Sequence, residues 1–119
     1  MGDADLYDAL GVQPEASNED IKRAFRRLSL TYHPDRRLDV DEKAAAGSRW
    51  LRIAAAYDVL SDEKRRMVYD ELGAEHLEQG LVLLNPQVDS AATLRRAFEK
   101  MQRRSDEREY ISRLRMSSS

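Results

Sequence analysis

Residues 21–35 read IKRAFRRLSLTYHPD and hold the strongest structural and functional signals of the chain. Apolar residues recur along this stretch at helical spacing, namely Ile21, Ala24, Phe25, Leu28 and Tyr32. The other face carries four cations, Lys22, Arg23, Arg26 and Arg27. Pro34 disfavours helical geometry at the residue before it, so the helix should stop near Tyr32. The stretch therefore predicts a basic amphipathic helix that ends at the tripeptide His33-Pro34-Asp35.

The sequence before this stretch predicts where the helix begins and places a short helix ahead of it. Ser17-Asn18-Glu19-Asp20 has the spacing of a capping box, and its acidic residues favour the helix dipole. A short helix is expected over residues 5–10, with Gly11 at its end.

The sequence after the tripeptide predicts a loop over 36–40 and a long helix over about 41–60. The apolar stripe of this helix consists of Trp50, Ile53, Tyr57 and Leu60. Gly47 lies inside it, at a cost of about 1 kcal/mol relative to Ala. Since the two long stripes are the only large apolar surfaces, we expect an antiparallel two-helix hairpin. Its predicted contacts are those of Tyr57 and Leu60 with Phe25 and Leu28.

Further helical signals begin at Ser61-Asp62-Glu63. A short helix with Val68, Tyr69 and Leu72 inward should end at Gly73, and the helical pattern resumes over 74–79 until Gly80. No alternating apolar pattern is long enough for a sheet. The predicted fold class is therefore all-α, a hairpin with short flanking helices and a C-terminal helical extension.

Charge divides the chain into an acidic domain and a basic extension. Residues 1–90 carry 12 Lys+Arg and 18 Asp+Glu, a net −6, whereas residues 91–119 carry 8 and 4, a net +4. We expect a domain over 1–75, a linker with room for a short helix over 76–90, an amphipathic helix over 91–116 and a disordered tail over 117–119. Tyr110 and Leu114 lie almost opposite the apolar face of Leu94, Phe98 and Met101. The last helix therefore either breaks near Ser105-Asp106 or offers different faces to different partners.

Composition excludes several kinds of site. The chain has no cysteine, which rules out disulfides, thiol chemistry and Cys-based zinc sites. His33 and His76 are the only histidines and have no ligand cluster around them, so we expect no metal, no cofactor and no catalytic residue. The longest apolar run is Leu81-Val82-Leu83-Leu84, and the N-terminus lacks the features of a signal peptide. We expect no membrane partner and a cytoplasmic or nuclear location, with an assembly-bound location as a further option.

Several strings, taken in order, resemble the J domain of the DnaJ (Hsp40) co-chaperones over roughly residues 5–73. They are Asp5-Leu6-Tyr7, the basic helix from Ile21 to Leu28, Tyr32-His33-Pro34-Asp35, Ala56-Tyr57 and Tyr69-Asp70. Departures are the longer connection from Asp35 to Trp50, Trp50 in place of the usual Phe, and Gly47. The Gly/Phe-rich linker, zinc region and β-rich domain of bacterial-type relatives are missing. The chain thus looks like the class with only a J domain plus a private extension.

This resemblance implies a protein that docks on an Hsp70 and stimulates its ATP hydrolysis, without being an enzyme itself. The Hsp70-binding residues that it implies are His33, Pro34, Asp35, Lys22, Arg23, Arg26, Arg27, Arg36, Arg65 and Arg66. The residue chemistry agrees, because clustered cations steer an acidic surface and Pro34 preorganises the loop. The other interpretation of the helical cations is a solvated face. Arg65 and Arg66 could equally form salt bridges with Glu63 and Asp62.

Two other functions stay open at this level. The protein could be a J-like structural subunit of a larger assembly, anchored by residues 81–116, with Leu94, Phe98 and Met101 as the partner-binding face. It could also bind nucleic acid through its basic tail, but the interleaved acids weaken this hypothesis. These acids are Glu99, Asp106, Glu107 and Glu109.

Overall fold

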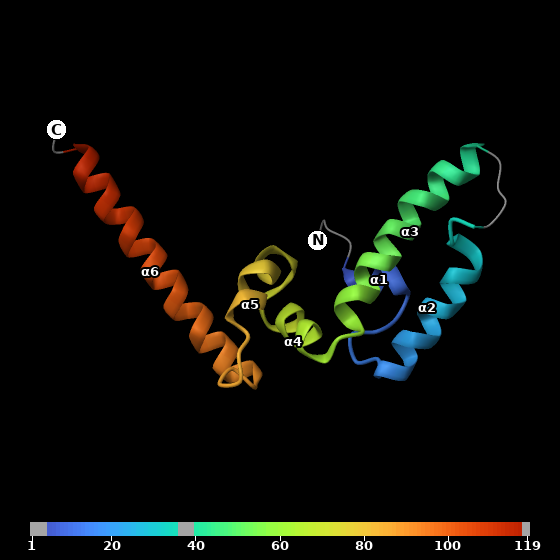
Figure 1. The fold of residues 1–119 in the computed structure, drawn as a ribbon, viewed down its shortest axis with the longest axis horizontal. Helices are drawn as coiled ribbons and strands as arrows, with labels where there is room; N and C mark the ends of the chain where they lie inside the picture. The colour runs from blue at the N-terminus through green and yellow to red at the C-terminus, as the bar shows by residue number, and fades with distance from the viewer. Residues whose placement is uncertain (1–4, 36–39, 118–119) are drawn as a thin grey trace. The chain divides into compact units, whose positions relative to one another are not determined.

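The computed structural model describes residues 5–35 and 40–117 of the 119-residue chain, and these ranges contain helices and no strand (Figure 1). The predicted all-α class is thus confirmed. The chain forms two compact units, Met1–Arg66 and Met67–Ser119, whose boundary falls within helix α4 (Glu63–Leu72). None of the described helices has the length and apolar composition that a bilayer crossing requires.

Three helices build the first unit. They are α1 (Leu6–Leu10), α2 (Asn18–Tyr32) and α3 (Val40–Leu60). Helices α2 and α3 run antiparallel, and α1 packs against both of them (Figure 1). Helix α3 continues through Gly47. The expected loop over 36–40 ends at Val40, which starts α3, and residues 36–39 lie outside the described ranges.

Local hydrogen bonds set the ends of α1 and α2 where the sequence predicts them. Ser17 Oγ accepts the backbone N–H of Asp20 at 3.1 Å, and Asp20 Oδ2 accepts that of Ser17 at 3.2 Å. The backbone hydrogen bond from Ser17, followed by the side-chain bond, holds the pKa of Asp20 below its ordinary value. Gly11 ends α1 with φ 68°, a left-handed conformation that favours glycine.

The core of the first unit joins all three helices. Leu10, Ile21, Ile53 and Leu60 are at most 1% exposed, and burial of each side chain contributes about 1.5–3 kcal/mol. The rings of Phe25 and Tyr57 stack at 4.0 Å between centroids and 8° between planes. This stack confirms the predicted contact between the two long helices. Leu28 is half-buried.

The second unit contains the end of α4, a 3₁₀ turn (Ala74–His76), α5 (Leu77–Leu83) and α6 (Ala91–Ser117). The sequence predicted that a helix over 74–79 ends at Gly80. This prediction is wrong, because Gly80 lies inside α5. A Cβ at Gly80 would lie 2.5 Å from Val68 Cγ1 and 2.7 Å from Leu72 Cδ1. This glycine therefore lets α5 approach α4 closely, and the expected linker over 76–90 contains a packed helix.

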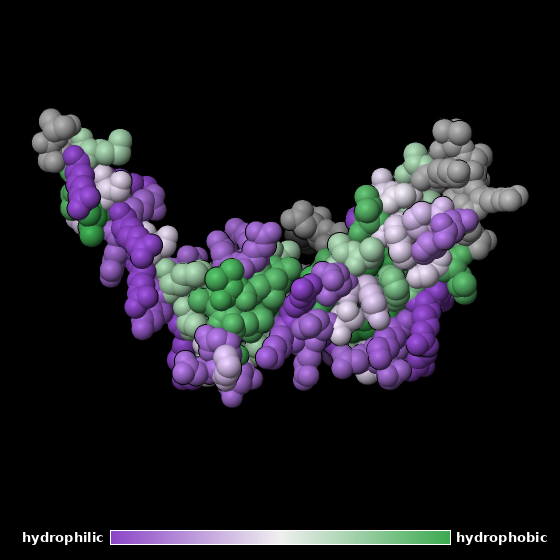
Figure 2. Space-filling model, viewed as in Figure 1, coloured by the Kyte–Doolittle hydropathy of each residue, from purple (hydrophilic) through white to green (hydrophobic). Residues whose placement is uncertain are grey.

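Helix α6 is continuous, so the expected alternative of a break near Ser105-Asp106 is wrong. Its first part packs within the unit: Leu94 is fully buried, and Arg95 pairs with Glu71 at 2.8 Å. Farther along, Tyr110 is 65% exposed. Helix α5 also exposes Val82, and Figure 2 shows a hydrophobic patch over this helix. The sequence predicted a disordered tail over residues 117–119. Ser117 is instead the last residue of α6, and residues 118–119 lie outside the described ranges.

We predict that Gly80→Ala destabilises the second unit, whereas Gly47→Ala stabilises α3. Both changes gain up to about 1 kcal/mol of helix propensity. At Gly80 the added methyl overpacks Val68 and Leu72, which costs about 1–3 kcal/mol, whereas nothing lies within 4 Å of a Cβ at Gly47. Urea unfolding followed by circular dichroism measures both effects. Equal stabilisation by the two changes would show that α5 does not pack closely on α4.

Candidate functional site

The tripeptide His33-Pro34-Asp35 forms a short turn at the end of α2. His33 has extended backbone (φ −60°, ψ 140°), as a residue before proline requires. The backbone N–H of Asp35 donates to His33 Nδ1 at 3.1 Å, which leaves Nε2 to carry the proton of the neutral ring. The Asp35 carboxylate is 93% exposed, with Oδ2 3.6 Å from His33 Nδ1. The turn therefore holds the imidazole in place and presents the carboxylate to solvent.

A column of aromatic rings connects this turn to the hairpin. The His33 ring meets Trp50 edge-on at 5.1 Å between centroids. Trp50 lies 5.7 Å from Phe25, which stacks on Tyr57. Trp50 thus positions the turn from α3, whereas its helical spacing in the sequence predicted only a core position. Its place on the apolar stripe, opposite the end of α2, was the available signal.

The four predicted cations of α2 are all exposed, but their charges differ in availability. Lys22 lies 4.0 Å from Glu19, and Arg23 lies 3.3 Å from Asp20. Arg26 and Arg27 have no ion pair with any described residue, and they are the two cations of the set closest in sequence to the tripeptide. Their charge is therefore free to attract an acidic surface.

The other predicted cations are placed differently. Arg65 pairs with Asp58 at 2.7 Å, and not with Glu63 or Asp62, which the sequence offered as alternative partners. Asp62 instead caps α4, accepting the backbone N–H of Lys64 and of Arg65, both at 2.9 Å. Arg36 lies outside the described residues.

Arg66 is engaged inside the first unit. Its guanidinium donates to the carbonyl oxygens of Ala16 at 2.6 Å and Pro14 at 3.1 Å. It also donates to the Tyr7 hydroxyl at 3.1 Å and lies 5.5 Å from the centre of that ring. These contacts join the start of α4 to the segment between α1 and α2, so Arg66 has a structural role in addition to any role in docking.

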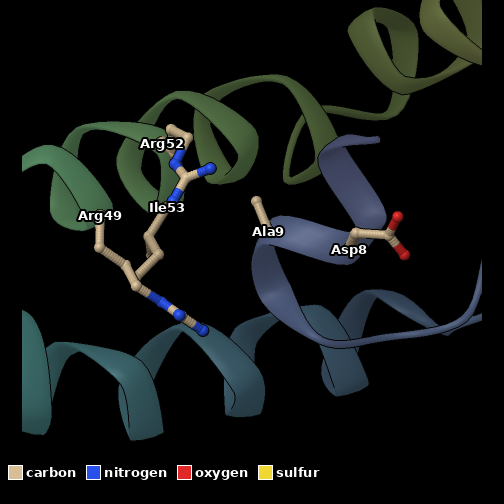
Figure 3. Close-up of a pocket in the computed structure, with 5 residues that line it drawn as sticks. All are labelled: Asp8, Ala9, Arg49, Arg52 and Ile53. Carbon is tan, nitrogen blue, oxygen red and sulfur yellow. The ribbon is translucent and has the colours of Figure 1, made fainter. Parts of the chain in front are cut away.

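A hollow of about 190 Å³ lies between α1 and α3 (Figure 3). Arg49, Arg52 and Ile53 line it from α3, and the Asp8 carboxylate on α1 points away from both guanidinium groups (Figure 3). The hollow therefore offers no close acid–base pair. No group of three metal-ligating side chains occurs among the residues that the structure describes. The turn and the cations of α2 are thus the candidate site.

The predicted partner-binding residues of α6 have three different surroundings. Leu94 is 0% exposed. Phe98 is half-buried and lies 5.0 Å from the His76 ring. Met101 lines a groove between α5 and α6. Of the three, Met101 alone borders this groove.

Comparison with known proteins supports the architecture of the first unit. The DnaJ domain model matches residues 5–70, more than half of the chain. The chain belongs to the DnaJ domain family. J-domain proteins partner with Hsp70 chaperones and are generally not enzymes themselves.

Individual relatives match different lengths of this J-domain protein. It is 50% identical over 76 residues to DnaJ homolog subfamily B member 6 of Xenopus tropicalis, covering 64% of this chain and 31% of the relative. It is 46% identical over 77 residues to subfamily B member 8 of Mus musculus, covering 65% and 33%. It is 37% identical over 108 residues to subfamily C member 11 of Mus musculus, covering 91% and 19%. The chain thus spans a third or less of the length of these relatives.

The match to subfamily C member 11 also bears on the extension. It covers 108 of the 119 residues, so at most 11 are left out and residues 12–108 must be included. The matched part therefore contains α5 and most of α6. The extension was expected to be peculiar to this chain. That expectation is wrong, because subfamily C member 11 matches most of the extension.

We predict that Arg66→Met destabilises the first unit by about 1–3 kcal/mol, because it removes charged hydrogen bonds to Ala16, Pro14 and Tyr7. Arg65→Met is the matched control, and we expect it to cost at most about 1 kcal/mol, since its partner pair with Asp58 is exposed. Urea unfolding compares the two variants. Equal losses of stability would refute the structural role of Arg66.

Proposed function

We propose that this J-domain protein docks on an Hsp70 and stimulates its ATP hydrolysis through the His33-Pro34-Asp35 turn. The observation that carries this proposal is the Asp35 carboxylate, 93% exposed on a turn that the His33 ring and Trp50 hold in place. An exposed anion on a preorganised turn can bind a cationic group of a partner without ordering the turn first. ATP and the catalytic groups belong to the Hsp70.

The cations of α2 complete the proposed docking surface. Arg26 and Arg27 provide charge that no described carboxylate neutralises, and Lys22 and Arg23 add to the same exposed surface. Such a surface steers an acidic partner and orients it before the turn makes contact. The residues proposed to contact Hsp70 are His33, Pro34, Asp35, Lys22, Arg23, Arg26, Arg27 and Arg65, together with Arg36, which lies outside the described residues. Arg66 is proposed mainly to support this surface.

One observation favours a second candidate function, that of a subunit anchored to a larger assembly. The far part of α6 exposes Tyr110, Ile111 and Leu114, by 65%, 48% and 50%. An exposed apolar stripe on a helix is typical of partner binding. Anchoring through residues 81–116 is compatible with Hsp70 stimulation. The cytoplasmic or nuclear location expected from the sequence stays a prediction.

We predict that His33→Gln or Asp35→Asn reduces stimulation of single-turnover ATP hydrolysis by a cognate Hsp70 by roughly tenfold or more. His33→Gln removes the imidazole that accepts the Asp35 backbone N–H, and Asp35→Asn removes the exposed negative charge that is proposed to bind a cationic group of the partner. Glu15→Gln, which neutralises another exposed carboxylate of the same unit, should leave stimulation unchanged. Helical circular dichroism and melting temperature should be the same for all variants. Full stimulation by both turn variants would overturn the proposal.

The second prediction concerns the charge of α2. Reversing Arg26 and Arg27 to Glu should weaken Hsp70 binding strongly, since these two cations lack a described ion-pair partner. Reversing Arg96 and Arg103 changes the net charge equally from α6 and should have little effect. Binding of the wild type should also weaken as ionic strength rises from about 0.1 M to about 1 M, because the screening length falls from about 10 Å to about 3 Å. Surface plasmon resonance measures each affinity. Equal losses from the two reversals would assign the effect to net charge alone.

A further inference from the structure

The second unit contains an open groove between α5 and α6, with a volume of about 530 Å³. Its apolar floor consists of Leu83 from α5 and of Ala97 and Met101 from α6, all half-buried. None of the residues that line it belongs to the turn or to α2. The groove therefore shares no described lining residue with the proposed Hsp70-docking surface.

One side of the groove carries a row of three cations, Lys100, Arg104 and Arg108. They are spaced four residues apart on one continuous helix, so successive positions are about 6 Å apart along its axis. All three are exposed, and none of their side chains has an ion pair or hydrogen bond with a residue that the structure describes. Their neighbours differ, because Arg95 pairs with Glu71 and Arg113 pairs with Glu109. The groove thus combines an apolar floor with positive charge that the described chain does not neutralise.

We propose that this groove binds an acidic segment of a partner protein, one that alternates carboxylates with apolar side chains. The row of cations fits successive carboxylates at a spacing of about one helical turn. The floor of Leu83, Ala97 and Met101 accepts an apolar side chain, which a purely electrostatic contact would not need. Charge complementarity and the floor together define the occupant.

Other polyanions fit the groove less well. None of the described residues that line it is aromatic, so single-stranded RNA bases find no stacking platform among them. Glu99, Asp106 and Glu107 also lie along the same helix and would repel a phosphate backbone. A short acidic peptide carries fewer negative charges than a phosphate backbone, so the same carboxylates repel it less. The groove residues also lie within residues 12–108, which the match to subfamily C member 11 includes.

The test uses the full chain and a fluorescein-labelled peptide in which glutamate and leucine alternate. A second peptide with glutamine in place of glutamate is the ligand control. Lys100→Gln combined with Arg104→Gln should weaken binding of the glutamate peptide by about tenfold or more, as measured by fluorescence anisotropy. Arg96→Gln combined with Arg103→Gln removes the same charge from α6 outside the groove and should leave the affinity unchanged. Met101→Gln should weaken both peptides, because it adds a polar group to the floor.

Each alternative outcome contradicts the proposal. Equal binding of the two peptides would exclude carboxylate recognition. If the two double variants lost the same amount of affinity, the effect would come from net charge alone and not from the groove. The same variants are tested with single-stranded RNA, with vesicles containing phosphatidylserine, and for self-association by sedimentation velocity. Tighter binding of RNA or vesicles than of the glutamate peptide, or a dimer that only the groove variants dissociate, would assign the groove to that other occupant.

Discussion

The stack of Phe25 on Tyr57 is the contact on which the rest of the J domain depends. At 4.0 Å between ring centroids it fixes the distance and register of α2 and α3. Trp50 extends the column to His33 at the end of α2. The same apolar stripe that closes the hairpin therefore also positions the functional turn. Folding and presentation of Asp35 are coupled, because a loosened hairpin would release the imidazole from its aromatic neighbour.

Local signals were sufficient to predict most helices of the first unit. Caps such as the Ser17–Asp20 pair act over three residues, and apolar periodicity identifies the buried face of α2 and α3 directly from the residues. The roles of Arg66 and Trp50 depend on partners far away in the sequence: Arg66 reaches Ala16 and Trp50 reaches His33. Contacts of this kind leave no local pattern, so the sequence predicted docking or a local salt bridge for Arg66 and a core position for Trp50.

The second unit was harder to predict for a related reason. Gly80 has the character of a helix end, but its lack of a Cβ serves the close approach of α5 to Val68 and Leu72. Propensity alone cannot distinguish these two uses of glycine. Likewise, Leu94 and Phe98 form an apolar face that a partner could cover, and in the structure they pack within their own unit. The cations beside Met101, which form no ion pair with a described residue, become evident as one side of a groove only once α5 packs beside α6.

The continuity of α6 has a mechanical consequence. A helix of 27 residues is about 40 Å long, at about 1.5 Å per residue. Because Leu94 anchors its first turns, the far end is held at a set reach, unlike the end of a flexible linker of the same length. A protein bound at Tyr110 would therefore be kept at a restricted distance from the packed end of the helix. Such a stiff helix raises the effective concentration of the bound protein only at sites that lie at the distance set by the helix. Sites at other distances are not reached.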